Sequence, residues 1–137
     1  MAILEVSDLK QYFYLEPTFL ARLVGGKKPR VIKAVDGMSF SMEPGEILGL
    51  AGESGCGKST CCLAIAKLRE PTGGIIRYKE SDIAEMSKKE IRNYRSEVQL
   101  IFQDPYESLN PRYTAFDLVA EPLRALTDKS KAEIKER

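Results

Sequence analysis

Residues Gly52 to Thr60 contain the spacing Gly-x-x-x-x-Gly-Lys-Ser, followed by a threonine. Glycines in such a loop let successive backbone N–H groups turn toward an anion, where a Cβ would interfere. A helix that begins near Lys58 would add the positive end of its dipole and its unpaired N–H groups. The pattern therefore predicts a site for the phosphates of a nucleoside triphosphate.

Single residues of this loop predict separate roles. Lys58 is placed to reach the β- and γ-phosphate oxygens, and the Ser59 hydroxyl to coordinate Mg²⁺, which prefers oxygen ligands. The N–H and hydroxyl of Thr60 are placed to bind the α-phosphate. The backbone of the other loop residues completes the nucleotide-binding set: Gly52, Glu53, Ser54, Gly55, Cys56 and Gly57. We expect the Cys56 thiol to be a packed side chain and not a redox switch.

The phosphate loop requires a strand before it and a helix after it. Residues 47–51 are apolar throughout, which is typical of a strand buried on both faces. Apolar residues in 58–68 follow a helical period, and Pro71 with the glycines that follow it ends the helix. The required context is therefore predicted on both sides of the loop.

Upstream of the loop, the sequence indicates antiparallel strands. Residues 3–6 alternate apolar and polar side chains. Segments 31–35 and 38–42 flank Asp36-Gly37, which suits a tight hairpin turn. A long loop is expected at 16–30, which contains two prolines and two glycines.

Downstream of the loop, strands and helices are expected in alternation: strands at 75–78 and 98–102, and helices at 87–94 and 115–126. Pro122 favours two shorter helical pieces over one continuous helix. Ser87 and Ser130 are each followed three residues later by glutamate, the spacing of a capping box that begins a helix.

The composition of the 137-residue chain, 43% hydrophobic and 30% charged, is typical of one globular domain. Because 21 basic residues balance 20 acidic ones without a basic stripe, duplex nucleic acid is not an expected partner. The absence of histidine from the sequence excludes a Ser-His-Asp hydrolase. Three clustered cysteines, Cys56, Cys61 and Cys62, indicate reduced thiols, with the last two expected in the helix core.

Two other assignments within the phosphate-loop class lack support. A GTPase would contain Asn-Lys-x-Asp, or an aspartate with glycine three residues later, and neither occurs. Segment 98–102 has the pattern of a strand that ends in a metal-binding aspartate. However, Gln103 occupies the first position after it, so Asp104 is not the expected Mg²⁺ carboxylate.

Two stretches, Glu53 to Thr60 and Leu100 to Arg112, together carry a family resemblance. They resemble ATPases of ABC transporters of the oligopeptide and dipeptide importer group, and the long loop before Val31 is similar to that group's N-terminal extension. The similarity covers about the first 40 to 50% of such a subunit. It implies an α/β fold, the N-terminal portion of a P-loop NTPase (ABC ATPase).

The resemblance also implies a division of the chain. Residues 1–46 would form mainly an antiparallel β subdomain that includes the long loop 16–30. Residues 47–103 would form a partial RecA-like core with a parallel sheet, from the phosphate loop to the Q-loop. Residues 104–137 would begin the helical subdomain.

Further site residues follow from the family motifs. Gln103 matches the Q-loop glutamine, which in the family reaches Mg²⁺ and the attacking water and links the nucleotide site to the permease. Together with Lys58, it would be catalytic. An aromatic residue near the end of the first strand stacks on adenine in the family, and Phe13 falls there, with Tyr12 adjacent. Adjacent strand residues face opposite sides, so only one of them can stack, and Phe13 is preferred.

The implied function is that of an ATP-binding, and in the complete subunit ATP-hydrolysing, component of an importer for peptides or a related solute. ATP and Mg²⁺ would be its cofactors. Its partners would be transmembrane permease subunits and a second ATP-binding subunit in a head-to-tail dimer. The chain would not insert into the membrane, and would lie in the cytoplasm on the membrane's inner face.

The family's later motifs, the Leu-Ser-Gly-Gly-Gln signature, the strand ending in Asp-Glu and the switch histidine, do not occur in these residues. This chain alone is therefore expected to bind ATP with little or no turnover. The alternative is a truncated, non-hydrolysing nucleotide-binding module that pairs with an intact ATPase subunit or permease. One departure from the family is Glu80, where glycine is usual, so the turn at 79–80 must either use a negative φ or bear strain.

Overall fold

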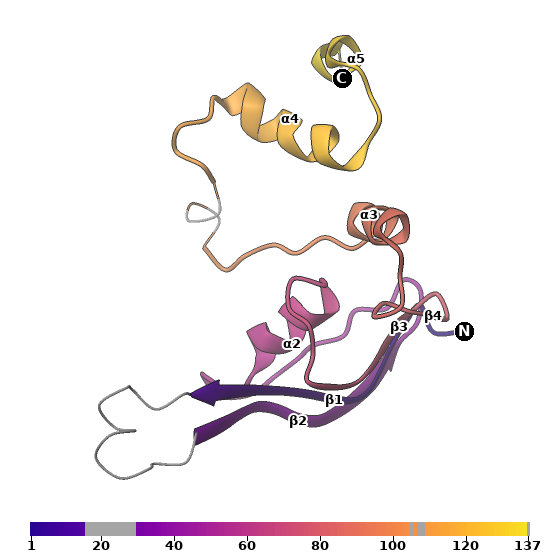
Figure 1. Ribbon diagram of the computed structural model, residues 1–137, viewed down its shortest axis with the longest axis vertical. Helices are drawn as coiled ribbons and strands as arrows, with labels where there is room; N and C mark the ends of the chain where they lie inside the picture. The colour runs from indigo at the N-terminus through magenta and orange to yellow at the C-terminus, as the bar shows by residue number, and fades with distance from the viewer. Residues whose placement is uncertain (16–29, 105, 107–108, 137) are drawn as a thin grey trace, which may run out of the picture. The chain divides into compact units, whose positions relative to one another are not determined.

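The computed structural model describes residues 1–15, 30–104, 106 and 109–136 (Figure 1). It contains two compact units, Met1–Met86 and Ser87–Arg137. The expected loop at 16–30 lies outside the described residues, except for Arg30. The three-part division of the chain stays a prediction.

The first unit is built on a four-stranded antiparallel sheet of order β2-β1-β3-β4 (Figure 1). Its strands are β1 (Leu4–Leu15), β2 (Arg30–Met42), β3 (Gly73–Tyr78) and β4 (Ser81–Asp82). The central strand β1 is much longer than the strand predicted at 3–6, because it has a partner on both edges. Alternate side chains of β1 are buried on one face, first Leu4 and Val6, then Leu9 and Gln11 after an irregularity in the pairing.

The hairpin predicted at Asp36-Gly37 is wrong. Strand β2 continues through this dipeptide and pairs with β1 on both sides of it, with Leu9 opposite Met38 and Lys10 opposite Asp36. Gly37 has a φ of 87° and forms a bulge. A bulge and a tight turn both use positive φ at glycine, so the Asp36-Gly37 dipeptide is compatible with either. The bulge lets β2 continue along β1, which satisfies the hydrogen bonds of more backbone groups than a hairpin would.

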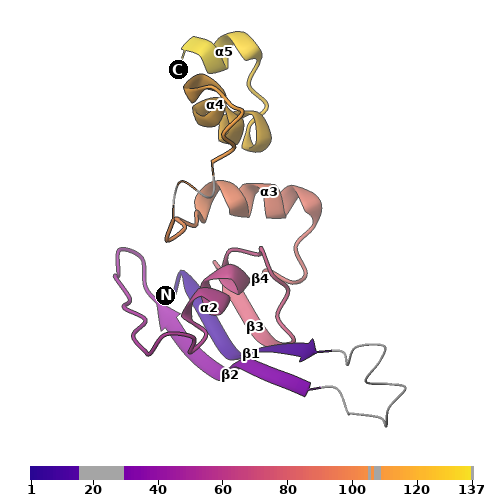
Figure 2. The same ribbon diagram turned by 90° about the vertical axis from the view of Figure 1, so that its left-hand side faces the viewer.

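Helix α2 (Lys58–Ile65) lies over one face of the sheet (Figure 2). Its small side chains Cys61 and Ala64 are fully buried, which lets the helix approach the strands closely. The helix begins where it was predicted but ends earlier, because Ala66 is its C-cap and Lys67 has a φ of 53°.

The strand predicted at 75–78 is confirmed as β3, and the turn that follows bears strain. Lys79 and Glu80 have φ values of 47° and 69°. A two-residue connection between antiparallel strands favours positive φ at both central residues. Lys79 and Glu80 therefore adopt the left-handed conformation although neither is glycine.

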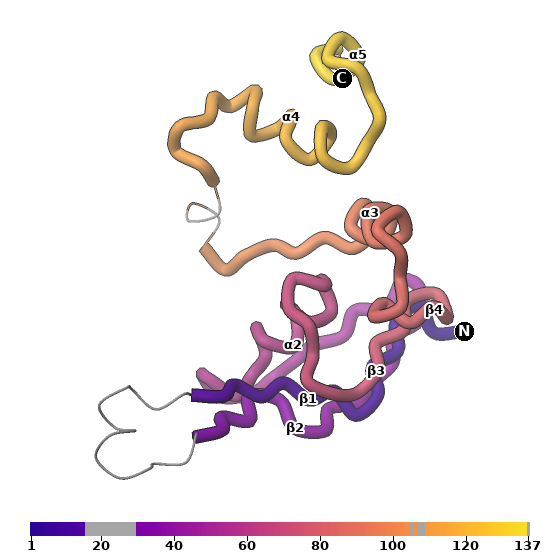
Figure 3. Tube along the Cα trace, in the orientation of Figure 1, coloured from indigo at the N-terminus to yellow at the C-terminus, as the bar shows by residue number. Residues whose placement is uncertain are grey.

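The two strands expected for a parallel core, at 47–51 and 98–102, are not formed. Figure 3 traces the path of the backbone through both segments. Ile47 is 97% exposed and Ile101 is 90% exposed. A strand that is apolar on both faces needs hydrogen-bonding neighbours and cover on each side. No strand within the described residues pairs with either segment, so both predictions are wrong for this structure.

The second unit contains three helices: α3 (Lys88–Glu97), α4 (Ala115–Leu126) and α5 (Lys131–Glu136). The capping boxes predicted at Ser87 and Ser130 are confirmed: each serine's Oγ and backbone N–H pair with the glutamate three residues later. Helix α4 is continuous through Pro122, so the expectation of two pieces is wrong. Pro122 is exposed, so water can satisfy the carbonyl that its missing N–H frees.

Arg92 ties α3 to the end of α4. Its guanidinium donates to the carbonyl oxygens of Ala125 and Thr127 at 3.1 and 2.8 Å, and pairs with the Asp128 carboxylate at 2.8 Å. A cation at the C-terminus of a helix also interacts favourably with the helix dipole. None of the helices in the described ranges is long and apolar enough to cross a membrane.

Candidate nucleotide-binding site

The loop before α2 turns tightly and packs against β2. The N–H of Cys56 donates to the Glu53 carbonyl at 3.3 Å, and Gly55 has a φ of 82°. Gly57 is buried with a φ of 96°, and a Cβ built on it would lie 2.1 Å from the carbonyl oxygen of Ala34. Only glycine fits there, so this residue fixes the end of the loop against the sheet.

The Lys58 side chain folds back over the loop. Its Nζ donates to the carbonyl oxygens of Gly52 and Glu53, both at 2.7 Å, and lies 3.5 Å from the Cys56 Sγ. An ammonium has three donors, and the carbonyl oxygens hold two of them. The Cys56 thiol is only a weak acceptor for the third donor. An anionic oxygen is a stronger acceptor and could take the place of the thiol.

In the part of the chain that the structure describes, no side chain caps the N-terminus of α2. Gly57 is the N-cap residue without a side-chain hydrogen bond, and the first turn contains no acidic residue. Unpaired N–H groups at such an end attract an anion. Ser59 is exposed and Thr60 half-buried on this turn, so Lys58, Ser59 and Thr60 lie together with the loop glycines as the sequence predicts.

The described residues contain no cluster of three or more His, Cys, Asp or Glu side chains that could hold a metal ion. The exposed Ser59 hydroxyl has no hydrogen-bond partner within the same residues. A hydroxyl oxygen fits Mg²⁺ as one ligand when phosphate oxygens supply others. The residues present are therefore compatible with Mg²⁺ bound together with a nucleotide.

Gln103 lies in the second unit, exposed in the segment between α3 and α4. The next residue, Asp104, accepts a hydrogen bond from the Tyr106 N–H at 2.9 Å. The roles of Gln103 in Mg²⁺ binding and catalysis stay predictions.

Phe13 and Tyr12 lie on opposite faces of β1. Phe13 has the same parity as the buried Gln11, and its ring lies under the guanidinium of Arg69, which follows α2. Phe13 therefore lies on the face that α2 covers, and this placement favours Phe13 over Tyr12 as the stacking residue.

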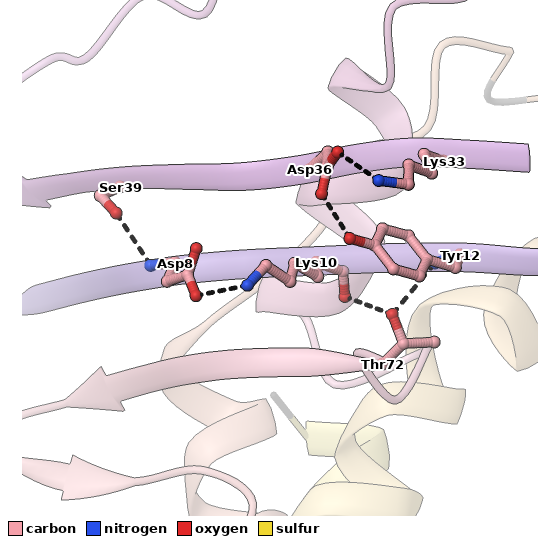
Figure 4. Close-up of polar contacts among 7 residues, drawn as sticks. All are labelled: Asp8, Lys10, Tyr12, Lys33, Asp36, Ser39 and Thr72. Atoms are coloured by element: carbon pink, nitrogen blue, oxygen red, sulfur yellow. Dashed lines mark hydrogen bonds and ion pairs between the residues drawn. The ribbon is translucent and has the colours of Figure 1, made fainter.

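Tyr12 belongs to a polar network on the other face (Figure 4). Its hydroxyl donates to Asp36, whose carboxylate also pairs with Lys33 at 3.0 Å. The hydrogen bond from Tyr12, followed by that from Lys33, lowers the pKa of Asp36 and keeps it ionised. Deprotonation of the Tyr12 hydroxyl would break its hydrogen bond to Asp36, so this bond raises the pKa of Tyr12. The hydroxyl of Tyr12 is thus already committed to the sheet.

All three thiols are free, as expected. Burial raises the pKa of Cys61 to about 11, which makes it unreactive at neutral pH. Cys62 is exposed, so its predicted place in the helix core is wrong. The exposed Cys56 borders the Lys58 ammonium.

Two residues near the site were missed by the sequence interpretation. Gln11 is only 4% exposed, and its Oε1 has no hydrogen-bond partner among the described residues. Continuing the alternation of Leu4 and Val6 along β1 would place Gln11 on the opposite face, so the sequence held no signal for it. The irregularity between Val6 and Leu9 brings Gln11 to the buried face. Arg69 carried no sequence signal, because its contact with Phe13 arises from tertiary structure.

Comparisons with known proteins decide the family. The sequence profile described as ABC transporter matches residues 35–136. The chain belongs to the ABC transporter family. It is 46% identical over 121 residues to the oligopeptide transport ATP-binding protein AppF of Bacillus subtilis, covering 88% of this chain and 35% of AppF.

The oligopeptide transport ATP-binding protein OppF of Escherichia coli is 42% identical over 136 residues, which are 98% of this chain and 40% of OppF. The chain thus spans between a third and two-fifths of the length of these two relatives.

Solved structures of ABC cassettes confirm the fold class. The dimeric ATP-binding cassette MJ0796, in a post-hydrolysis state bound to ADP and Pi, matches with a TM-score of 0.72. The match covers 97% of this chain and 53% of MJ0796 at 21% identity. The chain therefore has the α/β fold of the N-terminal portion of an ABC ATPase.

Proposed function

We propose that this chain binds ATP as part of the ATP-hydrolysing component of an ABC importer. One observation carries the proposal: the Lys58 ammonium lies over a glycine loop that leads into the uncapped N-terminus of α2. A cation and unpaired N–H groups then converge on one short segment, which is the arrangement that a polyphosphate requires.

Each loop residue has a defined task in this proposal. Lys58 moves from its carbonyl partners to the β- and γ-phosphate oxygens, while the backbone of Gly52–Gly57 surrounds the β-phosphate. Thr60 binds the α-phosphate. Ser59 and Gln103 hold Mg²⁺, which when bound neutralises charge on the phosphate oxygens.

The adenine of the nucleotide stacks on Phe13. The position of Phe13 on the face of β1 that α2 covers supports this role, because the phosphate loop leads into the same helix. The engagement of the Tyr12 hydroxyl with Asp36 on the other face supports the same choice.

In the complete protein, ATP hydrolysis drives import of peptides or a related solute. The chain then works with transmembrane permease subunits and with a second ATP-binding subunit, on the cytoplasmic face of the membrane. The names of AppF and OppF as oligopeptide transport proteins and the dimeric form of MJ0796 support these partners. Gln103 relays nucleotide state to the permease.

The 137 residues alone bind ATP with little or no turnover. The Asp-Glu pair that supplies a metal ligand and a base in the family does not occur in them. Losing a positioned base typically lowers a rate by about 10² to 10⁴-fold. A steady-state phosphate-release assay on the purified chain tests this: Mg²⁺-dependent turnover that Lys58→Ala abolishes would contradict the proposal.

Lys58→Ala tests the phosphate site. It should weaken ATP binding by about 10- to 100-fold, because a charged hydrogen-bond donor is lost, and leave adenosine binding nearly unchanged. Isothermal titration calorimetry with both ligands provides the measurement, and Lys89→Ala, an exposed lysine of α3, is the control. Equal losses for ATP and adenosine would show that Lys58 does not act on the phosphates.

A further inference from the structure

Arg69 contacts the aromatic ring that the proposed function assigns to the base. Its guanidinium carbon lies 4.9 Å from the centre of the Phe13 ring, within the range of a cation–π interaction. The side chain is exposed, and none of the described carboxylates forms an ion pair with it. The contact with Phe13 is therefore the main interaction of this guanidinium in the described part of the chain.

The backbone holds Arg69 near Phe13 from two directions. The Arg69 N–H donates to the Leu63 carbonyl of α2 at 3.2 Å. Three residues later, the N–H and hydroxyl of Thr72 donate to the Lys10 carbonyl at 2.8 and 2.9 Å, and the hydroxyl accepts from the Tyr12 N–H at 3.1 Å. The segment that carries Arg69 is thus anchored at α2 and at the part of β1 next to the ring.

Helix α2 therefore links the two ends of the proposed nucleotide site. Its N-terminus carries Lys58 and the phosphate loop, and Arg69 follows its C-terminal turn. Because Arg69 lies beyond the helix end, its contribution should concern the base and not the phosphates.

Building on the proposed function, we propose that Arg69 is a positioning residue for the nucleotide base. Arg69 fixes the orientation of the Phe13 ring, and the base stacks on that ring. A guanidinium on one face of the ring restricts the rotation of Phe13 and leaves the other face for a base. Because the ring is already ordered, binding of the base carries a smaller entropic cost.

The chemistry of the guanidinium allows two informative substitutions. Arg69→Lys keeps the charge but loses the plane that stacks flat on a ring, and Arg69→Gln keeps a planar group without the charge. Arg77→Gln is the matched control, because Arg77 on β3 pairs with Glu5 at 3.6 Å and lies outside the proposed site.

Calorimetric titration of the full chain with ATP, ADP and inorganic tripolyphosphate tests the proposal. Arg69→Gln should weaken ATP and ADP binding by the same factor, about 2- to 5-fold, as expected for an exposed cation–π contact. Tripolyphosphate has no base, so its affinity should not change. Arg69→Lys should fall between the wild type and Arg69→Gln, and Arg77→Gln should match the wild type.

A double-mutant cycle shows whether Arg69 acts through the ring. In a Phe13→Ala background, Arg69→Gln should have no further effect on ATP affinity. Additive losses would overturn the proposal, as would an equal loss of tripolyphosphate affinity. Tighter ATP binding by Arg69→Gln would mean that Arg69 competes with the base for the ring, and would also overturn it.

The same titrations separate this inference from the proposed function. If wild-type chain binds neither ATP nor tripolyphosphate, the nucleotide site itself fails, and the role of Arg69 fails with it. If Lys58→Ala abolishes binding of both while Arg69→Gln changes nothing, only the role of Arg69 is refuted.

Discussion

Strand β1 and segment 47–51 are both rich in apolar residues, but they have opposite environments. β1 pairs with β2 on one edge and β3 on the other, and its inward side chains are buried. Segment 47–51 pairs with no described strand, and its Ile47 is 97% exposed. The more hydrophobic of the two segments is thus the more exposed.

The difference shows what antiparallel and parallel strands each require. β1 finds its partners in β2 and β3 within the same compact unit, and only one of its faces needs cover. A strand apolar on both faces needs partners and cover on both sides, which come from distant parts of a chain. Hydrophobicity alone therefore identifies a segment that favours burial. It does not identify the strands and helices that would cover that segment.

Two isoleucine substitutions test this contrast most directly. Ile76 of β3 is 2% exposed, so Ile76→Ala should lower the free energy of unfolding by about 2 to 5 kcal/mol through lost burial and a cavity. Ile47→Ala removes the same atoms from an exposed site and should change it by less than about 0.5 kcal/mol. Urea denaturation followed by circular dichroism measures both, and similar losses at the two sites would mean that 47–51 is buried in solution.

Gly57→Ala tests the packing of the phosphate loop on the sheet. The new Cβ would meet the Ala34 carbonyl oxygen and demand a positive φ, for a loss of about 2 to 4 kcal/mol in unfolding free energy and weaker ATP binding. Gly45→Ala is the matched control: its φ is 79°, but nothing lies within 4 Å of its Cβ. If thermal denaturation shows equal losses for the two variants, strain alone acts and the contact with Ala34 is unimportant.

The smallest effect is expected at the strained turn between β3 and β4. Glu80→Gly removes a Cβ at a φ of 69° and should raise stability by about 0.5 to 1 kcal/mol, after the entropy of glycine in the unfolded chain is subtracted. Ser81→Gly places glycine in the adjacent strand and should destabilise instead. A destabilising Glu80→Gly would indicate that the glutamate side chain makes a contribution larger than the strain.

Local patterns predicted the parts of the fold that neighbouring residues determine. Ser87 and Ser130 begin helices with capping boxes because each cap involves residues three positions apart. The phosphate loop likewise turns on its own glycines, and α2 begins at Lys58. These predictions needed no information about distant segments.

Several predictions that depended on distant parts of the chain were wrong. Asp36-Gly37 is compatible with a hairpin and with a bulge, and the presence of β1 alongside β2 decides for the bulge. The continuous α4 follows from the exposure of Pro122, which the sequence does not state.

The amino-acid sequence by itself determined the phosphate loop, its lysine and hydroxyls, the helix caps and the family, because each is written in residues a few positions apart. Only the tertiary structure decided which aromatic residue of β1 lies on the α2 face, that Gly57 packs against the Ala34 carbonyl, and that Arg69 lies over Phe13. These features join residues more than 20 positions apart, and strand register and helix packing bring such residues together.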